Sequence, residues 1–206
     1  MNGYNRGNFL GSLPQVTKVI LLINVILFGL DYFTGHVIVN YLALYSLHTN
    51  AFKPYQLITH MFMHANLGHI FFNMFGLYIF GKVLETVLGS RKFFILYFLS
   101  GIGAASLQLF IYYLHGTDGI MIGASGAVFG ILAAFAMLFP NVELMIFLIP
   151  IPIKAKYLVP IYAIIELGSG IIDIKGDNIA HFAHVGGAIV GFILIKYWKK
   201  NQFNIN

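Results

Sequence analysis

The sequence has no cysteine and few charged side chains. None of its 206 residues is cysteine, and only 9% are Asp, Glu, Lys or Arg, against roughly 25% in an ordinary soluble domain. The absence of cysteine excludes a disulfide framework, a zinc ribbon and a thiol nucleophile. The shortage of charge, together with 59% hydrophobic residues, excludes both a disordered chain and an ordinary soluble fold.

The charges that are present do not indicate a nucleic-acid-binding protein. The formal net charge is +5, but the basic residues lie in short connectors and at the ends of apolar runs. A nucleic-acid footprint needs basic residues clustered on one face. We therefore expect the lipid bilayer as the chain's environment and no nucleic-acid partner.

Six apolar runs are long enough, or nearly so, to cross a hydrocarbon core about 30 Å thick. They cover approximately residues 16–34, 66–87, 92–114, 125–139, 156–172 and 179–198. The first run is longer than the apolar region of a signal peptide and has no small-x-small cleavage site behind it, so it is expected to be retained. No internal repeat is visible, and no soluble domain of any size remains outside the runs. The sequence predicts an all-α polytopic membrane protein, a six-helix bundle that forms one domain over residues 1–206.

Lys and Arg are distributed unequally between the connectors. If the N-terminus lies in the cytoplasm, ten of the twelve basic residues fall on the cytoplasmic side, and only Lys53 and Lys175 fall outside. Basic residues favour the cytoplasmic side of a membrane. We therefore predict that both termini are cytoplasmic.

Two segments depart from a simple bundle. Residues 35–64 form a long first connector that mixes apolar and polar residues, which predicts a loop lying in the outer membrane interface. The helix that begins at Ser125 is stopped by Pro140 after about 15 residues, or ~22 Å, which is less than the thickness of the hydrocarbon core. A glycine-rich, non-helical approach is tolerated at such depth only where it is buried in protein or lines a wet cavity. The pattern predicts a recessed pocket at Ser125.

A serine hydroxyl is inert unless another group activates it. In the last apolar run, His184, Gly187 and Gly191 share one helical face, and the glycines allow a neighbouring backbone to approach closely. The helix of Ser125 carries a similar pair of small residues, Gly126 and Gly130, on an adjoining face. Close packing of these two helices would bring His184 to the Ser125 hydroxyl.

Polar donors also begin the second apolar run. Asn66 suits the helix N-cap, which places His69 and Asn73 one turn apart on the same face. Two donors aimed at one point, together with a backbone N–H, are what a developing oxyanion needs. The alternative for the pair is a polar seam between helices.

No carboxylate has a clear position from which to orient the imidazole of His184. Asp173 and Asp177 lie in the connector before it, and Glu166 lies in the fifth run with an unknown facing. We therefore expect a Ser–His dyad rather than a triad. Phe129, one turn after Ser125, is placed either to stack on the His184 ring or to pack in the core.

With these groups assembled, the sequence resembles the rhomboid family of intramembrane serine proteases. The resemblance rests on three blocks in the same order and spacing, His64-x4-His69-x3-Asn73, Gly123-x-Ser125-Gly126 and Ala183-His184-x2-Gly187-x3-Gly191. It implies six helices around a water-filled cavity that opens to the extracytoplasmic side. Two features differ from the family's frequent pattern: Tyr55-Gln56 stands in place of a Trp-Arg pair, and Phe129 stands where many relatives have Tyr.

The resemblance implies roles for individual residues. Ser125 would be the nucleophile and His184 the general base and then acid, while His69, Asn73 and the Ser125 N–H would form the oxyanion hole. It also implies supporting positions at His64, Gly123, Gly126, Phe129 and Gly187. Neither a metal nor an organic cofactor is expected. The implied substrates are single-span membrane proteins cut after a small residue, and the implied location is the bacterial cytoplasmic membrane.

Two other classes of function remain open from the residues alone. Eight histidines suit a haem or metal binder, for instance through His69 and His184. His60-x3-His64 has zinc-motif spacing but carries Met61 where the HExxH motif has its Glu. A small transporter with its site at the short helix is the other alternative. Its weakness is that Glu166 is the only carboxylate firmly inside a predicted span.

Overall fold

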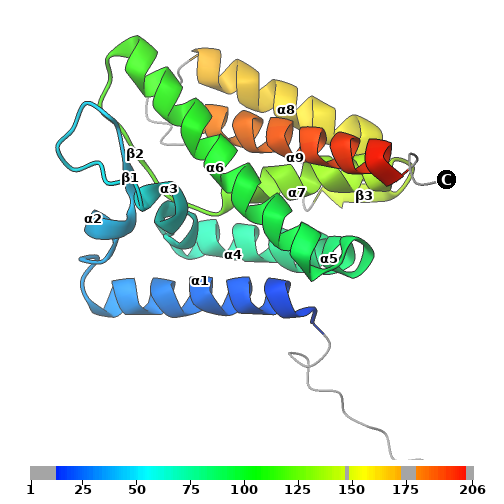
Figure 1. The fold of residues 1–206 in the computed structure, drawn as a ribbon, viewed down its shortest axis with the longest axis horizontal. Helices are drawn as coiled ribbons and strands as arrows, with labels where there is room; N and C mark the ends of the chain where they lie inside the picture. The colour runs from blue at the N-terminus through cyan, green and yellow to red at the C-terminus, as the bar shows by residue number, and fades with distance from the viewer. Residues whose placement is uncertain (1–12, 147–148, 173–179, 203–206) are drawn as a thin grey trace, which may run out of the picture.

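A computed structural model describes residues 13–146, 149–172 and 180–202. The chain is mostly helical, and its long helices lie roughly side by side (Figure 1). They are α1 (Gln15–Phe33), α4 (Leu67–Gly76), α5 (Lys82–Leu88), α6 (Ser90–His115), α7 (Ser125–Leu138), α8 (Ala155–Ile172) and α9 (His181–Gln202). A π-helical turn, Leu77–Gly81, joins α4 to α5, so the predicted second run is one nearly continuous rod.

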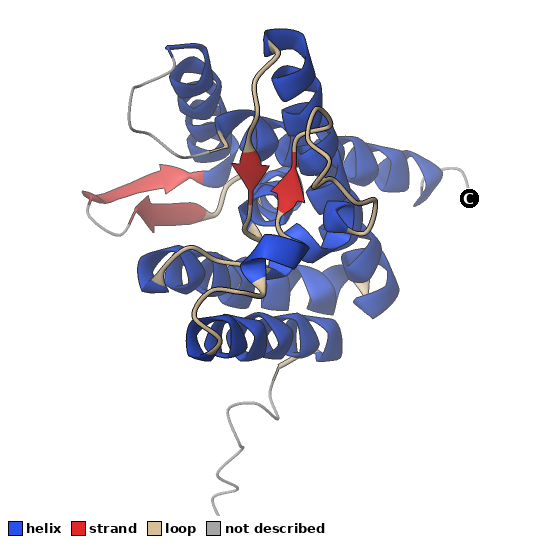
Figure 2. Ribbon diagram, turned by 90° about the vertical axis from the view of Figure 1, so that its left-hand side faces the viewer, coloured by secondary structure: helices blue, strands red, loops and turns tan. Residues whose placement is uncertain are grey.

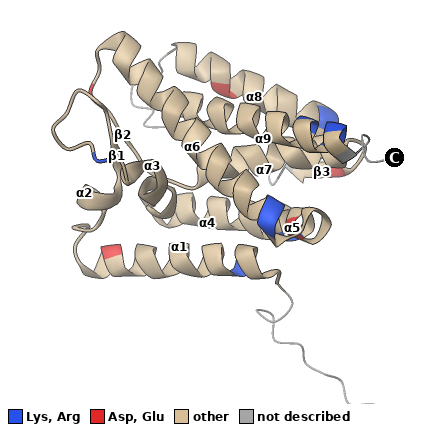
Figure 3. Cartoon of the chain, viewed as in Figure 1, with Lys and Arg blue, Asp and Glu red and all other residues tan. Residues whose placement is uncertain are grey.

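Four of these rods are long and apolar enough to cross a membrane. They are Gln15–Phe33, Leu67–Leu88, Ser90–His115 and Ala155–Ile172, and α7 is a shorter apolar helix. The chain is therefore a polytopic helical membrane protein, while the full count of six spans stays a prediction. Figure 3 shows Lys and Arg gathered at the end of the molecule that holds α5 and the C-terminal end of α9.

The sequence predicted an all-α fold, but two short antiparallel ladders also occur in the connectors (Figure 2). Strand β1 (Leu44–Tyr45) pairs with β2 (Ile120–Met121), and β3 (Glu143–Ile146) pairs with β4 (Ile149–Lys154). The first ladder satisfies backbone groups of the first loop next to the approach to Ser125. The second contains Pro150 and Pro152, which cannot donate to a ladder and are tolerated because a two-stranded sheet has free edges.

Gln56 organises the first loop, the segment in which the sequence departs from the family's Trp-Arg pair. Its buried side-chain oxygen accepts from the backbone N–H groups of Tyr45 and Lys53, at 3.4 and 3.0 Å. Its amide nitrogen donates to the carbonyl oxygens of Tyr41 and Ala51, at 3.3 and 3.1 Å. One side chain thus joins four points of the loop. Short helices α2 (Val39–Leu42) and α3 (Gln56–Thr59) and the 3₁₀ turn His60–Phe62 complete the segment.

Glu85 secures the opposite end of the bundle. Its carboxylate accepts from the backbone N–H groups of Val16 and Thr17 at 2.9 and 2.7 Å, and from the hydroxyls of Thr17 and Ser90 at 2.7 Å each. The two N–H groups belong to the first turn of α1, where a negative charge is favourable. This buried carboxylate therefore links α1, α5 and α6.

Helix α7 forms the centre of the molecule. Ten of its 14 residues are buried, because α6, α8, α9 and the π-helical turn pack around it. A Cβ on Gly187 of α9 would overlap the carbonyl oxygen of Gly126, and one on Gly191 would overlap that of Gly130. The two helices therefore touch backbone to backbone, as the glycine faces predicted. By contrast, only Ala155 and Glu166 are buried along α8.

Candidate active site

Ser125 is the first residue of α7 and follows an extended, glycine-containing approach. Gly123 has φ of 120°, a conformation that other residues rarely adopt. A Cβ at this position would also lie 2.6 Å from Nε2 of His69. The Gly123 N–H donates to the carbonyl oxygen of His60 at 2.9 Å. Glycine is therefore required at 123 for both its backbone angle and its close approach to His69.

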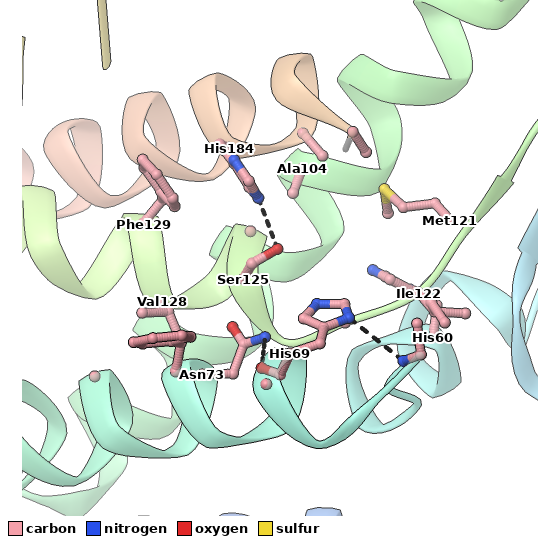
Figure 4. Close-up of a pocket in the computed structure, with 18 of the residues that line it drawn as sticks. His60, His69, Asn73, Ala104, Met121, Ile122, Ser125, Val128, Phe129 and His184 are labelled. Carbon is pink, nitrogen blue, oxygen red and sulfur yellow. Dashed lines mark hydrogen bonds between the residues drawn. The ribbon is translucent and has the colours of Figure 1, made fainter. Parts of the chain in front are cut away.

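His184 lies directly opposite Ser125, in the first turn of α9 (Figure 4). Its Nε2 is 2.8 Å from the Ser125 Oγ, which is hydrogen-bonding distance. The contact of Gly126 with Gly187 explains this approach, because Gly187 lies one turn after His184 on the same face of α9. The ring of Phe129 stacks on the His184 ring, with centroids 4.3 Å apart and planes 4° from parallel.

A carboxylate lies on the other side of His184, contrary to the prediction from the sequence. Oε2 of Glu166, on α8, is 2.7 Å from the Nδ1 of His184 and also 2.7 Å from the Nδ1 of His181. The expectation that no carboxylate is well placed to orient His184 is therefore wrong. The two other candidate carboxylates, Asp173 and Asp177, lie outside the described residues.

One signal in the sequence pointed to this arrangement. An ionisable residue in an apolar span usually faces the interior and pairs there, and Glu166 is such a residue. His181 and His184 are three residues apart, which places them on one helical face. What the sequence does not reveal is which neighbouring helix meets that face.

His69 and Asn73 face the Ser125 side of α4 and line the same cavity (Figure 4). The Asn66 side chain caps this helix by accepting from the His69 N–H at 2.8 Å. The Asn73 amide donates to the His69 carbonyl oxygen at 3.0 Å, so one of its two N–H donors remains for another acceptor. Both predicted oxyanion donors are thus near the serine.

His64, predicted to be a supporting residue, lies against the His69 ring. Its ring meets the His69 ring edge-on, with centroids 4.9 Å apart, and both its nitrogens are buried without a hydrogen-bond partner among the described residues. Burial lowers the pKa of His64 to about 3 and that of His60 to about 4. Both rings are therefore neutral at physiological pH.

These side chains surround a cavity of about 610 Å³. Residues from α4, α6, α7, α8 and α9 line it, including His69, Asn73, Ser125, Phe129 and His184. Within the described part of the chain, one group has the spacing of metal ligands, namely Glu166, His181 and His184, whose ligand atoms lie within 4.8 Å of one another. The hydrogen bonds above already account for this convergence.

Comparison with known proteins decides the family. Residues 51–200 match the family model described as the Rhomboid domain. The chain belongs to the rhomboid family. It is an integral membrane protein, and this assignment agrees with the resemblance drawn from its three sequence blocks.

The relatives come from bacteria and from organelles. The chain is 32% identical over 147 residues to "Rhomboid protein 1, mitochondrial" of Saccharomyces cerevisiae, covering 70% of this chain and 42% of that protein. It is 29% identical over 157 residues to "Rhomboid-like protein 11, chloroplastic" of Arabidopsis thaliana, covering 72% and 53%. It is 32% identical over 142 residues to "Putative rhomboid protease YdcA" of Bacillus subtilis, covering 68% and 65%. The chain thus spans less than two thirds of the length of each of these relatives.

Proposed function

We propose that this rhomboid-family protein is an intramembrane serine endopeptidase in which Ser125 is the nucleophile and His184 is the general base. The observation that carries the proposal is the 2.8 Å contact between His184 Nε2 and Ser125 Oγ. The pair lies in a cavity among helices rather than on an exposed loop. A serine and a histidine at this distance are the minimum required for nucleophilic catalysis.

Acyl transfer follows from this arrangement. His184 Nε2 takes the proton from the Ser125 hydroxyl as the oxygen attacks the substrate carbonyl carbon. The side chains of His69 and Asn73, with the Ser125 backbone N–H, donate to the oxyanion that develops. The protonated His184 then gives its proton to the leaving amine. Water in the cavity then attacks the acyl-enzyme with His184 again as base, the ester bond to Ser125 breaks, and His184 returns the proton to the serine oxygen. No cofactor takes part.

The substrates we propose are single-span membrane proteins, cut after a small residue that can enter the cavity. The end of the molecule that holds the basic residues would face the cytoplasm, so the serine would open to the opposite side. We propose the bacterial cytoplasmic membrane as the location, although relatives include mitochondrial and chloroplastic proteins.

The structure offers little support for the alternatives. Bis-histidine haem binding through His69 and His184 needs a free ring nitrogen on each, whereas both nitrogens of His184 are within hydrogen-bonding distance of Glu166 and Ser125. A transporter that binds its cargo through Glu166 would need that carboxylate free, whereas Glu166 is engaged by two histidines. We therefore retain the protease as the single proposed function.

A fluorophosphonate probe tests the proposal, because it reacts covalently only with an activated serine. We expect the wild-type protein to be labelled and the Ser125→Ala variant to remain unlabelled. Ser106→Ala is the matched control, since this α6 hydroxyl donates to the Ile102 carbonyl of its own helix. Equal labelling of the wild type and the Ser125→Ala variant would refute the assignment.

A further inference from the structure

We infer that Glu166 is a positioning residue that completes a Ser125–His184–Glu166 triad. The inference rests on the proposed protease function and deepens it. A serine–histidine pair has two ways to fail: the imidazole turns away, or its proton sits on the wrong nitrogen. The 2.7 Å contact between Glu166 Oε2 and His184 Nδ1 prevents both the rotation of the ring and the wrong tautomer.

The proton arrangement follows from the chemistry of the two atoms. An ionised carboxylate only accepts hydrogen bonds, so His184 Nδ1 must carry the proton it donates to Glu166. In the neutral ring, Nε2 is then the acceptor, and Nε2 is the nitrogen 2.8 Å from the Ser125 hydroxyl. The carboxylate thus fixes the one tautomer of His184 that can take the serine proton. It also stabilises the imidazolium that forms once the proton has moved.

Phe129 and Glu166 restrain the same ring in different ways. Phe129 stacks on its face, 4.3 Å away, which limits tilting but leaves rotation about the ring normal and the tautomer free. The hydrogen bond to Glu166 fixes the direction of Nδ1 within the ring plane. Together the two contacts define the position of Nε2.

The burial of Glu166 argues that the carboxylate has a function. It is only 6% exposed, in a helix whose other buried residue is Ala155. A carboxylate inside an apolar span is costly, and a hydrophobic side chain at the same place would often serve stability as well or better. His181 reduces this cost by placing its Nδ1 2.7 Å from the same oxygen. The carboxylate is therefore held between two rings, one of which reaches the serine.

The experiment compares Glu166→Gln, Glu166→Asp and Ile165→Ala, using kcat and KM for a transmembrane substrate in proteoliposomes and the rate of fluorophosphonate labelling. Ile165 is the matched control, because it adjoins Glu166 on α8 but has an exposed side chain. We expect Glu166→Gln to lower kcat roughly 10²–10⁴-fold, with KM little changed and the protein still monodisperse. The shorter carboxylate of Glu166→Asp should recover part of this loss, and Ile165→Ala should match the wild type.

Equal losses in Glu166→Gln and Glu166→Asp, or full activity in Glu166→Gln, would overturn the inference. The proposed function would survive either result, since it depends on Ser125→Ala in the same assay. A wild-type protein that neither cleaves nor labels would instead overturn the proposed function.

A second measurement needs no variant at Glu166 and therefore does not depend on that variant folding. Nitrogen-15 spectroscopy of histidine-labelled wild-type protein, with the signals assigned by His184→Gln, should show His184 protonated at Nδ1 and unprotonated at Nε2. The opposite tautomer would refute the inference.

Both measurements are made in chelator, because Glu166, His181 and His184 have metal-ligand spacing. Activity that is lost in chelator and restored by Zn²⁺ would also refute the inference.

Discussion

The contact between α7 and α9 makes a sharp prediction for Gly187→Ala. The added Cβ would overlap the carbonyl oxygen of Gly126, and it would lie 2.7 Å from the carbonyl carbon and 3.2 Å from the Cα of the same residue. Ordinary contacts begin at 3.4 Å, and all the opposing atoms are backbone. No side chain can rotate away, so α9 itself must retreat by about 1 Å or more in a closely packed interior.

The displacement of α9 moves His184 away from Ser125, because this residue lies one turn before Gly187 on the same face. A contact of 2.8 Å to Ser125 would lengthen to about 4 Å, which is no longer a hydrogen bond. A misplacement of about 1 Å can cost roughly 10²-fold in rate, while overpacking costs typically 1–3 kcal/mol of stability. We therefore expect Gly187→Ala to lower kcat/KM roughly 10²-fold or more in protein that still folds.

Cleavage of a transmembrane substrate in proteoliposomes measures the rate, and a thermal melt in detergent measures the stability. Gly29→Ala in α1 is the matched control, since nothing lies within 4 Å of the added Cβ; this variant should keep full activity and gain about 0.5–1 kcal/mol. A Gly187→Ala variant that cleaves within roughly threefold of the wild-type rate would contradict this prediction. It would mean that α7 and α9 do not meet backbone to backbone.

Two further predictions concern stability. Glu85→Gln removes a buried charge that accepts four hydrogen bonds and should cost about 3 kcal/mol in a thermal melt; exposed Glu143→Gln is the control, and equal melting temperatures in the two variants would contradict the account. The lowered pKa values of His60, about 4, and His64, about 3, predict that stability falls as the pH drops below about 6.5, because the unfolded chain then binds protons that the folded chain does not. At pH 5 each ring should cost about 2 kcal/mol; a melting temperature equal at pH 7 and pH 5 would contradict this.

The sequence predicted the helices and the Ser125–His184 meeting from signals that are local or periodic. Apolar runs, Pro140 as a stop and glycines at helical spacing are all visible along one chain. The pairing of α7 with α9 followed because a glycine face can be buried only against another backbone that approaches closely.

The partner of Glu166, the β1–β2 ladder and the role of Gln56 depend on contacts between distant parts of the chain, which local sequence patterns do not contain. Helix α8 is apolar nearly all round, so its facing cannot be inferred from periodicity, and the partner of Glu166 was missed for that reason. Strands β1 and β2 are two residues each, too short for an alternating pattern to be recognised. The role of Gln56 arises because four separate parts of the first loop fold around a single side chain.

Cleavage in a reconstituted membrane tests whether Ser125 is a nucleophile that His184 activates. The wild type, Ser125→Ala and His184→Ala are reconstituted with a single-span substrate, and the cleaved fragment is quantified beside a melt that verifies folding. We expect cleavage by the wild type and none by either folded variant. Cleavage by Ser125→Ala or His184→Ala at the wild-type rate would contradict it.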